Sequence, residues 1–133
     1  MYVFNYPLLV INILLYALRK YFNINIKPSG IYFAGFILGK GGPATKLILL
    51  KQLFGERYIN FKYIYLFSGS LRIPRPIIRF YKNIGVIVLI NQNGIYSPEW
   101  YSDSDMYDKN YKLLLYNNLC DFTFFQSEFS LNG

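Results

Sequence analysis

The sequence alternates short apolar runs with segments of helical periodicity. This alternation limits the possible folds more than any other feature of the chain. The runs contain few polar residues, unlike the alternating pattern of a half-exposed strand, so each is predicted to be a strand buried on both faces. The predicted strands are Ile31–Phe36, Tyr63–Ser70, Val86–Gly94 and Phe122–Phe129, and the predicted helices between them are Ala44–Phe54, Arg75–Asn83 and Met106–Leu119. This alternation indicates an α/β fold, a three-layer sandwich around a mostly parallel sheet of about four strands.

Polar residues and glycines follow each predicted strand at the point where it ends. These residues are Gly39–Gly42, Ser68–Ser70, Asn91–Gly94 and Ser127–Glu128. The carboxyl ends of parallel strands meet at one edge of the sheet, and ligands of open α/β sheets bind outside that edge. The sequence therefore predicts a binding site there, although ordinary polar loops would give the same pattern without a ligand.

The first of these loops, "GKGGPATK" from Gly39 to Lys46, has the composition of an anion-binding turn. Glycines let a backbone turn tightly or approach a ligand closely, and Pro43 suits the first position of a helix. The N–H groups at a helix N-terminus favour an anion, often a phosphate. We therefore expect Gly41, Gly42 and Pro43 to face a bound ligand.

The same loop fits the dinucleotide fingerprint G-x-G-x-x-G/A, with Gly39, Gly41 and Ala44 in its small-residue positions. The fingerprint also expects an acid about 20 residues later, and the corresponding stretch "SGSLR" contains none. NAD is therefore disfavoured, whereas Ser70 and Arg72 could hold the 2′-phosphate of NADP. An NADP-binding oxidoreductase fragment is one alternative function.

The charge balance of the chain favours an anionic partner. The 133 residues, enough for one domain, carry 14 Lys and Arg against 7 Asp and Glu, a net charge of +7. A basic patch is predicted at Arg72, Arg75, Arg79 and Lys82, either as a solvated face or as a site for lipid head groups or a phosphate-bearing acceptor. No nucleic-acid-binding module is recognisable, so nucleic acid is not the expected partner.

The residue types that are missing exclude several chemistries. The sequence has no His, which removes Ser-His-Asp and Cys-His nucleophile systems and every His-based metal site. Cys120 is the single cysteine, so no internal disulfide can form, and we expect a buried thiol in a reducing, cytoplasmic protein. Asp103 and Asp105 form a D-x-D sequence, but their place before a helix favours capping. No metal or cofactor is therefore expected.

The N-terminal segment is predicted to be an apolar helix within residues 1–27, separate from a domain formed by residues 28–133. Pro7–Leu18 is apolar apart from Asn12, and Arg19 and Lys20 follow directly. The run falls short of the about 20 apolar residues of a membrane span, and it lacks the flanks of a signal peptide. It could pack on the domain or lie in a membrane interface as a peripheral contact, so a non-catalytic membrane-surface module is a second alternative.

Three stretches together resemble a known family. The stretches "GKGGPATKLILLKQL", "VIVLINQNGIYSPEWY" and "CDFTFFQSEFS" are similar to the N-terminal, Rossmann-like domain of GT-B glycosyltransferases, in the retaining, nucleotide-sugar-dependent group. The resemblance covers about Ile31 to Phe129. It implies that the glycine loop lies at an interdomain cleft and that the strand ends contact substrates. The residues implied to bind substrate are Gly41, Gly42, Pro43, Asn91, Asn93, Gly94 and Glu128.

The same resemblance implies that this chain forms only part of a glycosyltransferase active site. In the family the donor site belongs to a second Rossmann-like domain, and we expect this chain, whose sequence reaches to Gly133, to lack it. We therefore expect a partial, acceptor-side domain that acts on a sugar or lipid-linked acceptor. Transfer from a nucleotide-sugar is expected only when a donor domain, such as a partner chain, completes it.

Overall fold

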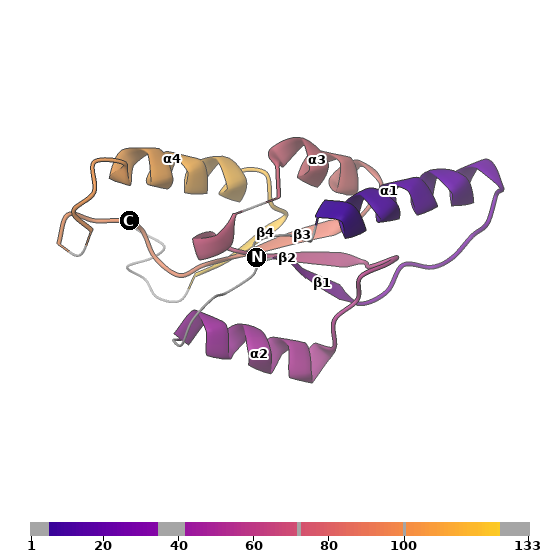
Figure 1. Ribbon diagram of the computed structural model, residues 1–133, viewed down its shortest axis with the longest axis horizontal. Helices are drawn as coiled ribbons and strands as arrows, with labels where there is room; N and C mark the ends of the chain where they lie inside the picture. The colour runs from indigo at the N-terminus through magenta and orange to yellow at the C-terminus, as the bar shows by residue number, and fades with distance from the viewer. Residues whose placement is uncertain (1–5, 35–41, 72, 100, 126–133) are drawn as a thin grey trace.

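A parallel four-stranded sheet lies between helices in the computed structural model, which describes residues 6–34, 42–71, 73–99 and 101–125. The strand order is β1-β2-β3-β4, and every neighbouring pair is parallel. In chain order the elements are α1 (Tyr6–Tyr21), β1 (Ile31–Ala34), α2 (Gly42–Phe54), β2 (Tyr63–Phe67), η1 (Ser68–Ser70), α3 (Arg75–Asn83), β3 (Ile87–Gln92), α4 (Met106–Asn117) and β4 (Phe122–Phe125). The predicted α/β three-layer, Rossmann-like class is confirmed (Figure 1).

The elements begin and end close to their predicted bounds, with local exceptions that have physical causes. β2 ends at Phe67, because Ser68–Ser70 turn into a short 3-10 helix instead of extending the strand. β3 begins after Val86, whose N–H donates to the Tyr81 carbonyl at 2.9 Å and so belongs to the exit from α3. The predicted ends of the first and last strands fall outside the described residues.

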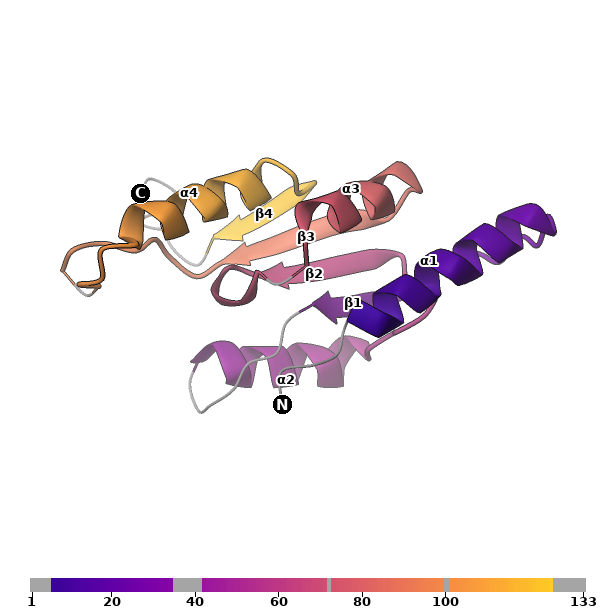
Figure 2. The same ribbon diagram turned by 45° about the horizontal axis from the view of Figure 1, so that its top comes forward.

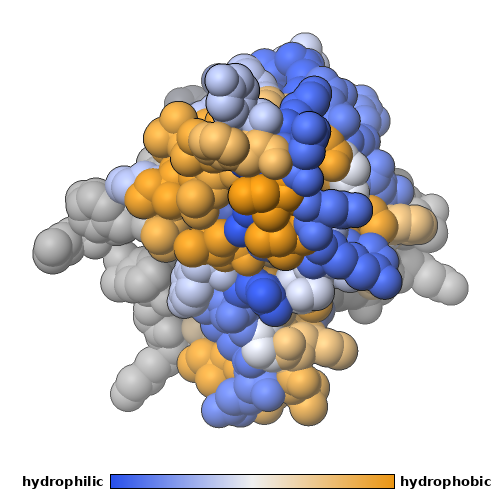
Figure 3. Space-filling model, turned by 90° about the vertical axis from the view of Figure 1, so that its right-hand side faces the viewer, coloured by the Kyte–Doolittle hydropathy of each residue, from blue (hydrophilic) through white to orange (hydrophobic). Residues whose placement is uncertain are grey.

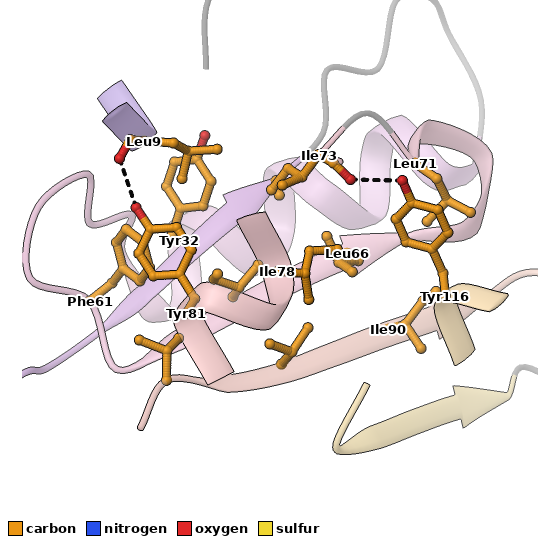
Figure 4. Close-up of a cluster of buried hydrophobic side chains, with 14 of the residues drawn as sticks. Leu9, Tyr32, Phe61, Leu66, Leu71, Ile73, Ile78, Tyr81, Ile90 and Tyr116 are labelled. Carbon is orange, nitrogen blue, oxygen red and sulfur yellow. Dashed lines mark hydrogen bonds between the residues drawn. The ribbon is translucent and has the colours of Figure 1, made fainter. Parts of the chain in front are cut away.

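One face of the sheet is covered by α1, α3 and α4, and the main core lies beneath them (Figure 1). Buried tyrosines anchor these helices: Tyr81 Oη donates to the Leu9 carbonyl at 2.9 Å, and Tyr116 Oη donates to the Ile73 carbonyl at 2.7 Å (Figure 4). The first of these bonds ties α1 to α3. Among the described residues, none of the helices has the length and apolar character needed to cross a bilayer.

Among the described elements, α2 is the one helix on the opposite face (Figure 1). Leu47 of α2 packs with Phe33, Tyr65 and Phe67 in a second, smaller core cluster. α2 lies beneath β1 and β2, as Figure 2 shows. The part of this face formed by β4 is left open, and Phe124 is 50% exposed.

The connections between strands have two different hands. The chain moves across the sheet in one direction, so crossovers on opposite faces must have opposite hands. The crossovers through α3 and α4 are right-handed, the usual hand, and the crossover through α2 is left-handed (Figure 2). Consequently α2 and α3, the helices that follow β1 and β2 in the chain, lie on opposite faces of the sheet.

Candidate functional site

The carboxyl ends of β2 and β3 are joined by a side-chain hydrogen bond. Ser68, the first residue after β2, accepts a bond from the Asn93 backbone N–H at 3.0 Å through its Oγ. Both residues are half-buried. Because the bond uses an oxygen lone pair, the Ser68 hydroxyl keeps its proton for a second acceptor. The bond therefore links the two strand ends and leaves the Ser68 O–H able to donate to a ligand.

Asn91 points from β3 toward the α2 side of the sheet. Its side chain is 1% exposed, and Nδ2 donates to Tyr65 Oη at 2.9 Å. Burial raises the pKa of Tyr65 above its ordinary value, and the bond from Asn91 only partly offsets this, so the phenol stays protonated at neutral pH. Within the described part of the chain, Asn91 Oδ1 is buried without a hydrogen-bond partner.

Gln92, the next residue, points toward the α4 side. Its Oε1 accepts a hydrogen bond from Asn117 Nδ2 of α4. Asn117 Oδ1 is a second buried amide oxygen without a partner among the described residues. A buried acceptor left unpaired costs about 1–3 kcal/mol, so each of these oxygens would gain from a bound donor.

A cavity of about 190 Å³ lies between η1 and α4 at this same edge. Its lining residues are Ser68, Gly69, Leu71, Tyr96, Lys109, Lys112 and Leu113. The side chain of Asn110 holds the Tyr96 backbone through two hydrogen bonds. Asn110 Oδ1 accepts from the Tyr96 N–H at 2.9 Å, and Asn110 Nδ2 donates to the Tyr96 carbonyl at 2.8 Å. We call this feature the η1–α4 cavity.

Lysine ammonium groups give the η1–α4 cavity its charge. Lys109 Nζ lies 4.3 Å from the centre of the Tyr101 ring and 5.4 Å from that of Tyr96, within the range of cation–π attraction. It also pairs with Asp105 at 3.2 Å. Lys112 follows one turn later on α4 and is exposed. Ammonium groups opposite a serine hydroxyl suit a phosphate group or another compact anion.

The structure brings some of the predicted substrate-binding residues together and separates others. Asn91, Asn93 and the half-buried Gly94 lie at the carboxyl edge of β3. Gly42 and Pro43 open α2, which packs on the other face from α4. Gly41 and Glu128 lie outside the described residues, as does Gly39 of the dinucleotide fingerprint.

The described residues of the predicted basic patch are spread along α3. Arg75 begins the helix, Arg79 is exposed in its middle, and Lys82 lies in its last turn. Lys82 Nζ is bonded to the Leu119 carbonyl at 2.6 Å and to Asp121 at 3.1 Å, so its charge is already paired. Arg72 lies outside the described residues.

The remaining reactive side chains have structural roles. Burial raises the pKa of Cys120 to about 12, and Asp121 adds to the rise while Lys82 opposes it, so the group is an unreactive thiol at neutral pH. Asp105 stands at the N-cap of α4, but its side chain makes no capping bond and instead pairs with Lys109. Of the carboxylates and the thiol in the described ranges, no three lie close enough to hold a metal ion.

Sequence reasoning did not single out Tyr96, Lys109, Lys112 and Asn117. The spacing of the two lysines on one helix after the third strand was the available signal, but a solvated helix face gives the same pattern. No protein-family model, curated protein or solved structure matches the chain.

Proposed function

We propose that the carboxyl edge of the sheet binds a phosphorylated, hydroxyl-rich small molecule of the nucleotide-sugar class. The observation that carries this proposal is the η1–α4 cavity, where Lys109 and Lys112 lie across from the Ser68–Gly69 turn. Lysine is a common phosphate binder because it acts as a concentrated positive charge. The neighbouring tyrosine rings offer flat surfaces to a sugar or a base.

The size of the cavity limits how much of the ligand it can hold. Small-molecule sites usually have volumes of about 300–1,000 Å³, and the η1–α4 cavity has about 190 Å³. It can therefore hold a phosphate with part of a sugar, while the remainder extends along the strand ends.

In this proposal the chain is the acceptor-side domain of a glycosyltransferase. The resemblance in the sequence supports this role. It implies that a second domain supplies the rest of the donor site, while this chain contacts the phosphates and sugar of the nucleotide-sugar from the acceptor side. The residues of this chain then bind and orient substrate, and sugar transfer belongs to the completed enzyme.

The proposal is tested by calorimetric titration of the full chain with UDP-glucose, UDP, glucose and NADP in separate experiments. We expect saturable binding of UDP-glucose and UDP, weakened about tenfold in Lys112→Ala by loss of one charge from the cavity. Lys62→Ala is the matched control, since Lys62 is an exposed lysine beside the amino end of β2 and should change affinity less than twofold. The proposal would be overturned if only NADP bound, or if Lys112→Ala left the affinity for UDP unchanged.

A further inference from the structure

The helix α1 turns an apolar stripe away from the protein. Its outward positions include Ile11, Leu14 and Tyr21, whose exposed fractions are 44%, 58% and 81%. A surface helix of a globular protein normally presents polar residues outward and apolar residues to the core. Here the polar Asn12 points inward and is 7% exposed. The outer face of α1 is therefore not built to meet water.

Hydrogen bonds hold α1 in this orientation. Asn12 Nδ2 donates to the Tyr58 carbonyl, and Asn12 Oδ1 accepts from the Asn60 N–H at 3.1 Å. Leu9, on the same inner side, is 1% exposed, and its carbonyl accepts from Tyr81 Oη. Rotating the apolar stripe inward would break these bonds, so the stripe stays exposed in the folded domain.

The stripe continues into the segment after the helix and forms one surface. We define the α1 face as Val10, Ile11, Leu14, Leu18, Tyr21, Phe22, Ile24 and Ile26, each at least 44% exposed. Beside it runs an apolar groove of about 390 Å³, lined by Ile13, Tyr16, Ala17, Lys20, Tyr21 and Phe80. The end of the molecule that carries the C-terminal half of α1 shows hydrophobic surface bordered by hydrophilic surface (Figure 3).

The charged residues of the segment that forms the α1 face are all basic. They are Arg19, Lys20 and Lys27, and the first acidic residue of the sequence is Glu56. Two copies meeting through the same face would bring these cations together, which disfavours a symmetric dimer. A surface that is apolar at its centre and negative at its boundary complements the α1 face, and an anionic bilayer interface has this character.

We propose that the α1 face docks on the surface of an anionic lipid bilayer. α1 lies in the plane of the interface, with Leu14 and Leu18 at the acyl boundary and the groove beside Phe80 open to an acyl chain. The cations at the C-terminal end of α1 contact the head groups. This docking does not depend on the proposed sugar-nucleotide site, which lies at the opposite end of the strands.

The test is co-sedimentation of the full chain with vesicles of pure phosphatidylcholine and with vesicles that also contain phosphatidylserine. We expect binding to the anionic vesicles only, falling as salt rises from about 0.1 M to about 0.5 M. Leu14→Asp should weaken binding at least tenfold. Leu114→Asp on α4 is the matched control, because Leu114 is 52% exposed against 58% for Leu14 and should leave binding unchanged. Arg19→Gln with Lys20→Gln should lower affinity about fivefold per charge.

Several results would overturn the proposal. They are equal binding to both vesicle types, no binding to either, and anionic binding that Leu14→Asp leaves intact. Sedimentation velocity without lipid adds one more outcome: a wild-type dimer that Leu14→Asp converts to a monomer would make the α1 face a self-association surface. None of these measurements uses a nucleotide, so failure here is distinct from failure of the proposed function.

Discussion

Tyr32 and Tyr81 are buried on either side of Phe61, but their hydroxyls have different surroundings. Tyr81 Oη donates to the Leu9 carbonyl, whereas Tyr32 Oη has no hydrogen-bond partner among the described residues. Removing a paired hydroxyl costs about 0.5–1.5 kcal/mol, and removing an unpaired buried one recovers a desolvation penalty. We expect Tyr81→Phe to lower the free energy of unfolding in urea by about 1 kcal/mol. Tyr32→Phe should leave it unchanged or raise it, and a loss in both variants would contradict the assignment.

Burial of the same two phenols makes stability depend on alkaline pH. It raises the pKa of both Tyr32 and Tyr81 above the ordinary value of 10.0, with the charge of Glu56 adding to the rise at Tyr32. Above about pH 10 the unfolded phenols lose their protons and the folded ones keep them, so the unfolded state binds fewer protons. This stabilisation is fully present below about pH 10 and is lost as pH rises through 10 toward the higher folded pKa.

The measurement is the free energy of unfolding at about pH 8.5 and about pH 11, on either side of the ordinary phenol pKa. The double variant Tyr32→Phe, Tyr81→Phe should lose less stability across this interval than the wild type. Tyr107→Phe is the control, because Tyr107 is 78% exposed and should leave the pH dependence unchanged. Equal pH dependence in all three proteins would contradict the prediction.

At the scale of single elements, the turn before β1 depends on a glycine. Gly30 has φ +81°, and a Cβ placed there would lie 3.0 Å from Arg57 Cδ. Its carbonyl also accepts from the N–H groups of Lys62 and Tyr63, which joins the starts of β1 and β2. Gly30→Ala should lower the free energy of unfolding by about 1–3 kcal/mol, through the positive φ and the contact with Arg57.

Other glycines separate these causes. Gly85 has φ +92° with open space around it, so Gly85→Ala reports the backbone cost alone. Gly69 has open space and no positive φ, and Gly69→Ala should change stability by less than about 0.5 kcal/mol. The measured order of loss should be Gly30 first, then Gly85, then Gly69; a loss at Gly69 equal to that at Gly30 would show that the turn geometry is not the cause.

Local signals explain why most elements could be predicted from the sequence. Pro76 near the start of α3 and Gly55 after α2, where its φ is +68°, mark helix ends that any fold would respect. Asn91 and Asn93 could be predicted because they end an apolar run. Their partners could not, since the bond from Asn93 to Ser68 exists only once β2 and β3 pair. The orientation of α1 could not be predicted from the sequence either, because its apolar face points outward and its polar residue, Asn12, points inward.

At the scale of the whole molecule, apolar patterns on both faces of the strands leave the placement of helices undetermined. Ile64 and Leu66 of β2 face one cluster while Tyr65 and Phe67 face the other, and both sets are buried. The sequence of such a strand does not predict which face of the sheet the next helix covers. The left-handed crossover through α2 therefore follows from tertiary packing.

That arrangement leaves part of the sheet uncovered, which leads to a prediction about association. Phe122 and Phe124 pair in register with Leu89 and Asn91 on the α2 side and are 59% and 50% exposed. Each exposes about 100 Å² of a side chain that can bury 150–250 Å². Covering this surface at about 25 cal/mol per Å² stabilises a complex by a few kcal/mol. Among the described residues no strand pairs with the outer edge of β4, which adds a second route to association.

We therefore expect concentration-dependent self-association through β4, weakened at least tenfold in the double variant Phe122→Thr, Phe124→Thr. Threonine keeps the strand propensity while removing most of the apolar area. Tyr107→Thr with Tyr111→Thr is the control, since it removes two exposed aromatic rings from α4, away from the sheet edge. Sedimentation velocity over a range of concentrations measures the effect, with Leu14→Asp included to separate β4 from the α1 face. If Leu14→Asp reduces association and the β4 variant does not, the protein associates through the α1 face and not through β4.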